Sequence, residues 1–357
     1  MKILITGGHV TPALAVIDKL KESHGIIFVG RKYALEHEQT LSFEYKQVTA
    51  RNIKFVDLRT GRVSRILSGR SLLSLLRIPL GFLKSFQIMR QEKPDTVLTF
   101  GSYLGVPIAF WAYVFRIPLF THEQTILPGL ANRFIAFFSK KIFVSFPETT
   151  QYFKKDKVIL TGNPVRESIF NVQKTTLEIE KIKPVIFVAG GSLGSHSVNV
   201  HIFAILKSLL KDYIVIHQTG DTKEYKDFEK AQAIKHPCYF PQKHFLEDEI
   251  GYVYSITDLF IGRSGANTFF ELVALGIPAL FIPLPWSGHK EQQKHATLFK
   301  NAGCGEIFFQ NQKSEDLLNT ISRMFSKGDS YKKSVKNLEK FYAQNATDVI
   351  IKEITTK

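Results

Sequence analysis

Short apolar runs that end in glycine turns and lead into helix-length segments recur through both halves of this chain. Such runs occupy 2–5, 26–29, 96–100, 118–121 and 141–145 in the first half, and 185–189, 213–218, 259–261 and 279–282 in the second. This alternation is typical of parallel sheets whose strands are joined by crossover helices. Because the same plan appears twice, we predict an α/β chain of two doubly wound, Rossmann-like domains that face a cleft.

The alternation is interrupted at 161–166, where Gly162 and Pro164 break the pattern. We therefore expect an N-terminal domain over 1–164 and a C-terminal domain over 165–340. The amphipathic, lysine-rich tail predicts terminal helices, and a helix over about 341–357 is expected to pack back on the N-terminal domain. A chain of 357 residues with 44% hydrophobic content is large enough to build two such cores.

The cysteines and the lengths of the apolar segments argue against a disulfide-stabilised, secreted or membrane-spanning protein. Only Cys238 and Cys304 are present, which excludes a disulfide framework and favours a reducing cytoplasm. Neither cysteine has the spacing of a metal ligand. The three apolar residues after Lys2 are too few for a secretory signal, and the stretch 106–115 is too short for a spanning helix of about 20 residues.

The formal net charge of +15 suits nucleic acid, an anionic membrane or a phosphorylated substrate. In the segment 62–90, basic residues are threaded through leucines, isoleucines and phenylalanines at near-helical spacing. Such a segment is typical of binding to an anionic membrane surface, and it equally suits a core-facing helix with solvated arginines. No nucleic-acid recognition motif is visible, so nucleic acid is not an expected partner.

The segment 258–271, DLFIGRSGANTFFE, carries the most informative chemistry. An apolar strand ends at Ile261, a turn through Ser264 and Gly265 follows, and Glu271 lies about two turns into the next helix. Backbone N–H groups of the turn and the helix start suit a diphosphate, and a glutamate on that helix can accept hydrogen bonds from both ribose hydroxyls. The alternative is an ordinary βα turn with a surface glutamate.

Two further glycine turns, at 6–9 and 190–195, also follow apolar strands. Neither matches the dinucleotide fingerprint, and neither is followed by the Gly-Lys-Ser/Thr of a P-loop. Both offer backbone free of side chains beside a helix start, which suits a diphosphate or a developing oxyanion.

Separated stretches of the chain resemble the MurG family of glycosyltransferase family 28, the peripheral-membrane N-acetylglucosaminyltransferases of peptidoglycan synthesis. The stretches are TGGHVTPALAV (6–16), FGSYLGVP (100–107), HEQTILPGLANR (122–133), TGNPVR (161–166), AGGSLGS (189–195), HQTG (217–220), RSGANTFFE (263–271), GIPALFIPLP (276–285) and EQQKHA (291–296). They occur in the family's order and cover most of the length.

The resemblance implies the GT-B fold and inverting transfer of GlcNAc from UDP-GlcNAc to the muramoyl 4-hydroxyl of lipid I, the undecaprenyl-diphosphate-linked muramoyl-pentapeptide, to form lipid II. It implies no cofactor and no essential metal. It also implies a peripheral location on the cytoplasmic face of the cell membrane, with the anionic inner-membrane surface and other cell-wall synthesis proteins as partners.

For the donor, the resemblance assigns residues from both halves of the chain. It implies that Ser192 contacts the diphosphate, that Arg166 pairs with the phosphate or ribose region, and that Gln292 reads the GlcNAc hydroxyls. Leu246 is expected beside the uracil. The residues implied to wrap the nucleotide and GlcNAc are Ala266, Asn267, Thr268, Phe269, Phe270 and Glu271, with Glu271 on the ribose, and Thr6, Gly7, Gly8 and Thr125 complete the donor-binding set.

For the acceptor, the resemblance places His9 at the floor of the cleft. An imidazole has a pKa near working pH, so His9 is the candidate general base for the acceptor hydroxyl, or alternatively an electrostatic partner of a diphosphate. The residues implied on the acceptor side are Tyr103, His122, Glu123 and Asn132, of which His122 and Glu123 are alternative participants in the chemistry.

The chain departs from the family pattern at Leu4 and Ile5, where the family usually has glycines, and at Ser102, Thr125, Lys290 and His295. The first two departures shorten the phosphate-facing loop before Thr6. Three alternatives stay open: a UDP-GlcNAc 2-epimerase, a glycolipid synthase that uses another lipid acceptor, and a catalytically weak sugar-nucleotide-binding protein.

Overall fold

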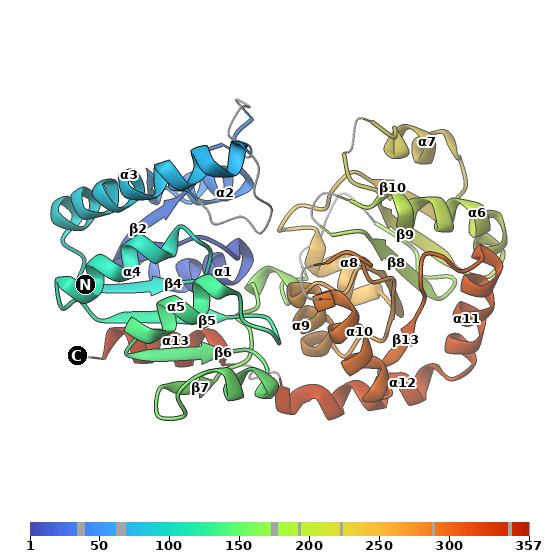
Figure 1. Cartoon of the computed structure of the whole chain (residues 1–357). Coiled ribbons are helices and arrows are strands. Elements are labelled where there is room, and N and C mark those ends of the chain that lie inside the picture. The colour runs from blue at the N-terminus through green and yellow to red at the C-terminus, as the bar shows by residue number, and fades with distance from the viewer. Residues whose placement is uncertain are drawn as a thin grey trace. The chain divides into compact units, whose positions relative to one another are not determined.

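The computed structural model describes residues 1–33, 40–61, 69–172, 178–191, 194–221, 224–287, 290–341 and 345–356, with the backbone alone for 69–76 and 339–341. These residues form two compact units, Met1–Arg166 with Ala343–Lys357, and Glu167–Tyr342. Each unit is built around its own parallel sheet (Figure 1). The prediction of two doubly wound, Rossmann-like folds is therefore confirmed.

The first unit contains a seven-stranded sheet of order β3-β2-β1-β4-β5-β6-β7, and every strand pair is parallel. Its strands are β1 (Lys2–Thr6), β2 (Gly25–Gly30), β3 (Lys54–Asp57), β4 (Thr96–Thr99), β5 (Leu119–Glu123), β6 (Lys141–Val144) and β7 (Val158–Leu160). Its helices are α1 (Val10–Leu20), α2 (Phe43–Ala50), α3 (Gly69–Glu92), α4 (Gly105–Val114), α5 (Leu130–Phe138), the 3₁₀ turn η1 (Pro147–Tyr152) and α13 (Ala346–Thr355).

Successive side chains of a strand point to opposite faces of a sheet, and β1 shows the result. Ile3 and Ile5 pack on one face with α1, α2 and α13, whereas Leu4 packs on the other face with α3, α4 and α5. The C-terminal helix α13 lies beside α1 and β4 (Figure 1), and its Ile350 and Ile354 are buried in the first of these cores.

The second unit contains a six-stranded parallel sheet of order β10-β9-β8-β11-β12-β13. Its strands are β8 (Val185–Ala189), β9 (Ile214–Gln218), β10 (Tyr239–Gln242), β11 (Leu259–Gly262), β12 (Ala279–Phe281) and β13 (Gly305–Ile307). Its helices are α6 (His196–Asp212), α7 (Asp227–Ala233), α8 (Ile250–Ile256), α9 (Ala266–Leu275), α10 (Glu291–Asn301), α11 (Ser314–Ser326) and α12 (Gly328–Val335), with 3₁₀ turns η2 (Glu167–Ile169) and η4 (Lys336–Phe341).

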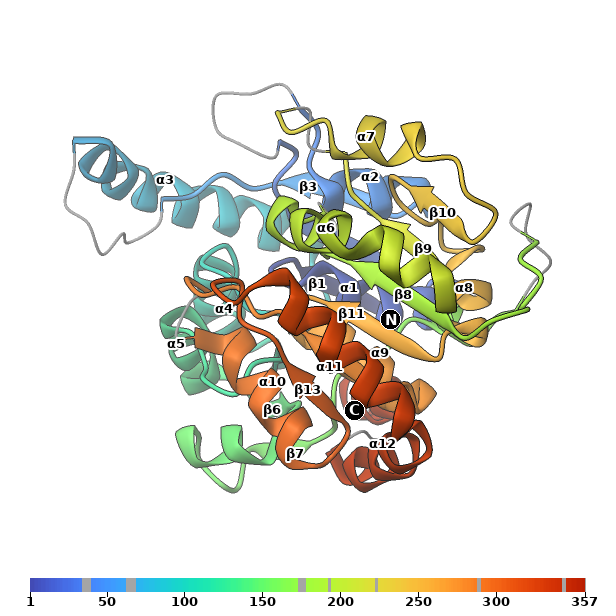
Figure 2. The ribbon, with the colours of Figure 1, turned by 90° about the vertical axis from the view of Figure 1, so that its right-hand side faces the viewer.

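Helices cover both faces of this second sheet. The helices α6 and α11 pack together, and Figure 2 shows them in front of the strands, whereas α9 and α10 pack together on the other face. Within the described ranges, no helix is both long enough and apolar enough to cross a lipid bilayer. Cys238 and Cys304 are both buried and unpaired.

Strand order reverses between β1 and β4 in the first sheet, and between β8 and β11 in the second. The chain leaves these neighbouring strands toward opposite faces of the sheet, and such reversal points are where open α/β sheets bind ligands. The glycine turns singled out in the sequence follow β1, β8 and β11, and therefore lie at the two reversal points.

Candidate active site

At the reversal point of the first unit, Gly7, Gly8 and His9 connect β1 to α1. A Cβ at Gly8 would lie 2.6 Å from the carbonyl oxygen of Phe100, the residue that follows β4. The two strand ends therefore approach each other closely only because Gly8 has no side chain. Leu4 and Ile5 are fully buried in β1, so both belong to the apolar strand and not to the loop that follows it.

His9 is fixed by its backbone at the start of α1. Its N–H donates to the Phe100 carbonyl at 3.3 Å, and its buried Nδ1 has no hydrogen-bond partner among the described residues. Burial lowers the pKa of His9, whereas the Glu123 carboxylate and a backbone interaction with Phe100 act to raise it. The ring is therefore neutral at pH 7, which is the state that a general base requires.

His122 is a second buried histidine in this region, on β5. Its Nε2 lies 3.2 Å from Ser145 Oγ and 3.3 Å from the Gly162 carbonyl oxygen, and its buried Nδ1 has no partner within the described ranges. Burial lowers the pKa of His122 to about 3, with a smaller contribution from His9. His122 is thus a neutral core side chain at physiological pH.

Glu123, at the end of β5, is a buried carboxylate that accepts three hydrogen bonds. Its Oε1 accepts from the Thr125 N–H (2.9 Å) and hydroxyl (2.8 Å), and its Oε2 accepts from Asn132 Nδ2 (2.7 Å). Thr125 and Asn132 are themselves buried. The side chains of Thr125 and Asn132 thus both donate hydrogen bonds that hold the Glu123 carboxylate in place.

Other residues expected on this side pack into the first unit. Thr6 is fully buried, and its hydroxyl has no partner among the described residues. Tyr103 is partly buried against the core formed by α3, α4 and α5. Ser102, where the family has glycine, has a φ of +74°, in the left-handed region that favours glycine.

At the reversal point of the second unit, the turn after β8 depends on its glycines. A Cβ at Gly190 would lie 2.3 Å from the Ser195 nitrogen, and Gly194 has a φ of +79° with its Cβ position 2.2 Å from the Thr219 carbonyl oxygen. Neither position can carry a side chain without movement of the backbone. Ser192, the predicted diphosphate contact, lies outside the described residues.

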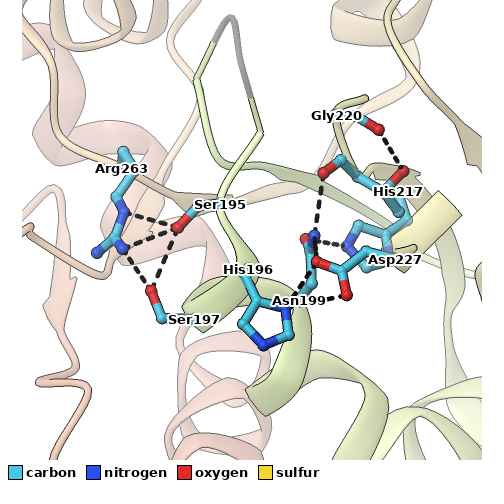
Figure 3. A network of polar contacts seen from close by, with 9 residues as sticks. Ser195, His196, Ser197, Asn199, His217, Gly220, Asp227 and Arg263 are labelled. Atoms are coloured by element: carbon cyan, nitrogen blue, oxygen red, sulfur yellow. Dashed lines mark hydrogen bonds and ion pairs between the residues drawn. The ribbon is translucent and has the colours of Figure 1, made fainter. Parts of the chain in front are cut away.

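Arg263 follows β11 and joins several loops of this unit. Its guanidinium donates to the hydroxyls of Ser195 (2.8 Å) and Ser197 (2.6 Å), to Gln310 Oε1 (3.0 Å) and to the Ile282 carbonyl (2.7 Å). Figure 3 shows the two serines, at the start of α6, facing this guanidinium. Burial lowers the pKa of Arg263 to about 10, so the side chain remains charged at pH 7.

The helix α9 follows directly after Gly265 and carries Glu271 on its buried side. Glu271 is 4% exposed, and its Oε2 accepts a 2.9 Å hydrogen bond from the Tyr254 hydroxyl. It is therefore not the surface glutamate of the alternative interpretation. The side chains of Phe269 and Phe270 are fully buried and pack in an aromatic cluster, so a nucleotide contact at these two positions would come from the backbone.

Most of the remaining donor residues are partly or fully exposed. Ala266 is buried, whereas Asn267 and Thr268 are partly exposed in the first turn of α9. Leu246 is 64% exposed. Gln292 is partly exposed in α10, and its side-chain Oε1 accepts a hydrogen bond from the Leu284 N–H at 2.9 Å. Arg166 is partly exposed at the end of the first unit.

A second polar network lies beside the turn after β8 (Figure 3). His217, on β9, contacts Asn199 Oδ1 and the Tyr239 hydroxyl, each at 3.0 Å. Asn199 donates to Asp227 at 2.8 Å, and Asp227 lies 2.9 Å from His196 Nδ1. This chain of contacts ties the start of α6 to the start of α7. Burial lowers the pKa of His217 to about 3.

Sequence comparison identifies the family. Residues 6–144 match the glycosyltransferase family 28 N-terminal domain, and residues 185–353 match the glycosyltransferase family 28 C-terminal domain. The UDP-N-acetylglucosamine--N-acetylmuramyl-(pentapeptide) pyrophosphoryl-undecaprenol N-acetylglucosamine transferase of Clostridium novyi (strain NT) is 33% identical over 98% of this chain and 97% of its own. The chain belongs to glycosyltransferase family 28. A transferase of the same description from Treponema denticola is 31% identical over 89% of this chain and 85% of its own.

Solved structures agree with the family 28 fold. The MurG of Acinetobacter baumannii superimposes with a TM-score of 0.73 at 23% identity over 99% of both chains. A UDP-GlcNAc 2-epimerase from Neisseria meningitidis, bound to UDP-GlcNAc, gives a TM-score of 0.69 at 16% identity over 99% of both chains. Both likenesses show the shared fold.

Each unit of this family 28 chain gathers part of the predicted set at its own reversal point. The first brings together Gly7, Gly8, His9, Glu123 and Asn132, and the second brings the turn after β8 together with Gly265 and Ala266 at the start of α9, the helix that carries Glu271. Arg263 and Tyr254 were not predicted. A cation directly after an apolar strand was the available signal for Arg263, whereas nothing local marks Tyr254 as the partner of Glu271. Across the described residues, no group of three or more potential metal ligands is present.

Proposed function

We propose that this protein transfers GlcNAc from UDP-GlcNAc to the muramoyl 4-hydroxyl of lipid I, with inversion at the anomeric carbon, and so forms lipid II. The observation that carries this proposal is full-length similarity to transferases of this description, together with glycine turns at the reversal points of both sheets. The fold alone supports a wider range of activities, because UDP-GlcNAc 2-epimerases share it.

In the proposed reaction, His9 removes the proton of the acceptor hydroxyl. The neutral state of its ring supports this role, as does its Nδ1, which has no partner among the residues that the structure describes. The acceptor oxygen then attacks the anomeric carbon as the bond to UDP breaks. Glu123 acts on His9 at a distance, because a buried carboxylate held by three donors opposes the loss of basicity that burial causes.

The donor is assigned to the second unit. The turn after β8, with Ser192, receives the diphosphate, because backbone N–H groups at a helix start attract phosphate. Glu271 accepts hydrogen bonds from the ribose, and its bond from Tyr254 holds the carboxylate in one orientation. The amide NH₂ of Gln292 contacts the sugar, Leu246 lies beside the base, and Arg166 supplies charge to the phosphate region.

The first unit also carries an apolar face that suits a membrane. Seven large apolar side chains of α3, α4 and α5 are 45–74% exposed: Leu80, Leu83, Tyr113, Val114, Leu130, Phe134 and Phe137. We call this set the apolar face. Arg77 and Lys84 are exposed on α3 among these residues. The residues 62–68, and the side chains of 69–76, lie outside the described part of the chain.

An exposed apolar surface rimmed by cations suits a bilayer that contains anionic lipid. We therefore place the protein peripherally on the cytoplasmic face of the cell membrane, where a lipid-linked acceptor and other cell-wall synthesis proteins are within reach. An epimerase would need no such surface, because UDP-GlcNAc is soluble.

An acceptor panel distinguishes the candidate functions. Purified protein is incubated with labelled UDP-GlcNAc and with lipid I, diacylglycerol or no acceptor. The proposal predicts a labelled lipid product with lipid I alone. Formation of a ManNAc product, such as UDP-ManNAc, without acceptor would assign an epimerase. Label in a diacylglycerol product would assign a glycolipid synthase, and donor binding without turnover would assign a sugar-nucleotide-binding protein.

A further inference from the structure

Gln218 is the last residue of β9, and both neighbouring strands end level with it. The register pairs Gln218 with Ala189, the last residue of β8, on one side and with Gln242, the last residue of β10, on the other. Figure 2 shows β9 between these two strands. The turn after β8 and the segment after β10 therefore begin on either side of the same residue.

The Gln218 amide joins these two loops directly. Its Nε2 donates to the Gly191 carbonyl oxygen in the turn after β8 at 3.2 Å, and its Oε1 accepts from the Phe245 N–H in the segment after β10 at 3.3 Å. A side chain needs both a donor and an acceptor to make these two bonds at once, and the amide of Asn or Gln provides both. Gln218 thus bridges two backbone segments that its own strand separates.

On the β8 side, the bridge reaches a turn with open space beside it. The Gly191 carbonyl oxygen accepts from the Gly194 N–H at 3.1 Å as well as from Gln218, so two donors hold it. Gly191 has a φ of +91°, and a Cβ there would meet no described atom within 4 Å. The backbone of the turn is therefore fixed at Gly191 while the space next to this residue stays open.

On the β10 side, the bridge holds the residue before Leu246. The Phe245 ring packs against Phe187 of β8, with ring centroids 5.8 Å apart, and the Phe245 N–H is the group that donates to Gln218. The Leu246 N–H donates to Glu249 at 2.9 Å, whereas the Leu246 side chain remains 64% exposed. A backbone segment that is fixed by hydrogen bonds thus presents an apolar side chain at the surface.

The two bridged loops are the ones assigned to the two ends of the donor nucleotide, the diphosphate after β8 and the base beside Leu246. We propose that Gln218 is a positioning residue that sets the separation of these two subsites, so that the base and the diphosphate of one nucleotide are bound together. The inference rests on the proposed function, because it takes UDP-GlcNAc as the donor and the second unit as its binding site.

The separation of the subsites matters because the base and the diphosphate belong to one molecule. Once one end of such a ligand is bound, the other end has a high effective concentration at its own subsite only if the spacing of the subsites matches the ligand. Gln218 acts on this spacing through the backbone of two loops. It therefore contributes to the affinity for the whole nucleotide and little to the affinity for either end alone.

The test compares a whole nucleotide with its two ends. Binding of UDP, uridine and pyrophosphate is measured by calorimetry and ligand-detected NMR for the wild type and for Gln218→Met, which keeps a similar shape but loses both hydrogen bonds. UDP should bind about 10- to 100-fold more weakly to the variant, whereas uridine and pyrophosphate should bind as they do to the wild type. Gln232→Met, at an exposed position of α7, is the matched control and should bind all three ligands normally.

A shorter amide separates the span of the bridge from its polarity. Gln218→Asn keeps the donor and the acceptor but is one methylene shorter, so it should reproduce the UDP defect of Gln218→Met. In transfer assays, both variants should raise KM for UDP-GlcNAc and leave kcat and KM for lipid I near the wild-type values, because the bridge affects donor binding equally before and during transfer. If Gln218→Met does not fold, Gln218→Asn carries the same comparison of ligands.

Equal losses for UDP, uridine and pyrophosphate in a folded variant would overturn the role of Gln218, because they would show general damage to the site. Wild-type UDP affinity in either variant would also overturn it, while the proposed function would stand. A wild-type protein that binds no UDP would instead overturn the proposed function, and this inference with it.

Discussion

Asn132 donates a 2.7 Å hydrogen bond to the Glu123 carboxylate, and both side chains are buried. Glu123 is the last residue of β5 and Asn132 lies in α5, so this bond links the end of the strand to the helix that follows it. The charge of Glu123 acts to raise the pKa of His9, against the larger effect of burial, which lowers it. The pair therefore supports both the packing of the first unit and the electrostatics of its reversal point.

Asn132→Ala should lower the free energy of unfolding by about 1–3 kcal/mol, because the buried carboxylate loses a donor. Urea denaturation measures the loss, with Gln87→Ala on the exposed side of α3 as the control. In a double-mutant cycle with Glu123→Gln, the two changes should be non-additive. Additive effects would show that the two side chains do not interact as described.

His9→Ala should lower kcat by about 10²–10⁴-fold if His9 is the general base. KM for UDP-GlcNAc should change little, because the base acts on the acceptor. Because burial lowers the pKa of His9, the acidic limb of the kcat profile should lie below pH 6.5 in the wild type and disappear in the variant. A defect confined to KM would assign His9 to binding.

Buried histidines should make the protein sensitive to acid. The unfolded chain protonates a histidine near pH 6.5, whereas the folded chain protonates His217 only at about pH 3. Unfolding therefore takes up a proton in this window, and stability falls as the pH falls. His217→Gln should reduce the slope of stability against pH by about 1.4 kcal/mol per unit there.

Glu271→Ala should raise KM for UDP-GlcNAc about tenfold or more, because a ribose contact through a charged acceptor is lost. Tyr254→Phe removes the hydroxyl that donates to Glu271 at 2.9 Å, and it should raise KM less than Glu271→Ala does. Steady-state kinetics with varied donor measures both. If Tyr254→Phe and Glu271→Ala both left KM unchanged, the ribose assignment would be wrong.

Phe137→Ser and Leu130→Ser should each weaken sedimentation with vesicles that contain anionic lipid by about tenfold, since each removes an apolar side chain from the apolar face. Wild-type binding should also weaken as salt rises. Phe170→Ser, at an exposed position in the second unit, is the matched control and should sediment as the wild type does. Equal sedimentation of all variants would exclude the apolar face as the membrane contact.

The fold was predictable because its central strands are continuous apolar runs bounded by glycine. The strands β1, β8 and β11 lie in the interior of the sheets and are buried on both faces. Each is therefore a continuous apolar run that can be recognised in the sequence. The strands β3, β7, β10 and β13 were not predicted. They are the edge strands of their sheets, with only three or four residues and only partial burial, so they are short signals in the sequence.

The candidate site was less predictable than the fold. Glycine turns follow strands in the sequence, so the reversal points could be anticipated. The partners of buried polar groups could not, because Glu271 and Tyr254, or Arg263 and Gln310, meet only once separate segments are folded. The burial of Phe269 and Phe270 was not predictable either, since a motif match does not show which of its side chains pack in the core.

The transfer reaction itself tests the account most directly. The wild-type protein is incubated with labelled UDP-GlcNAc and verified lipid I, and the products are examined for stoichiometry and for the configuration of the new linkage. The account predicts one UDP released for each lipid II formed, with a β-linked GlcNAc on the muramoyl 4-hydroxyl. Failure to label lipid I under conditions in which the protein binds UDP-GlcNAc would contradict it.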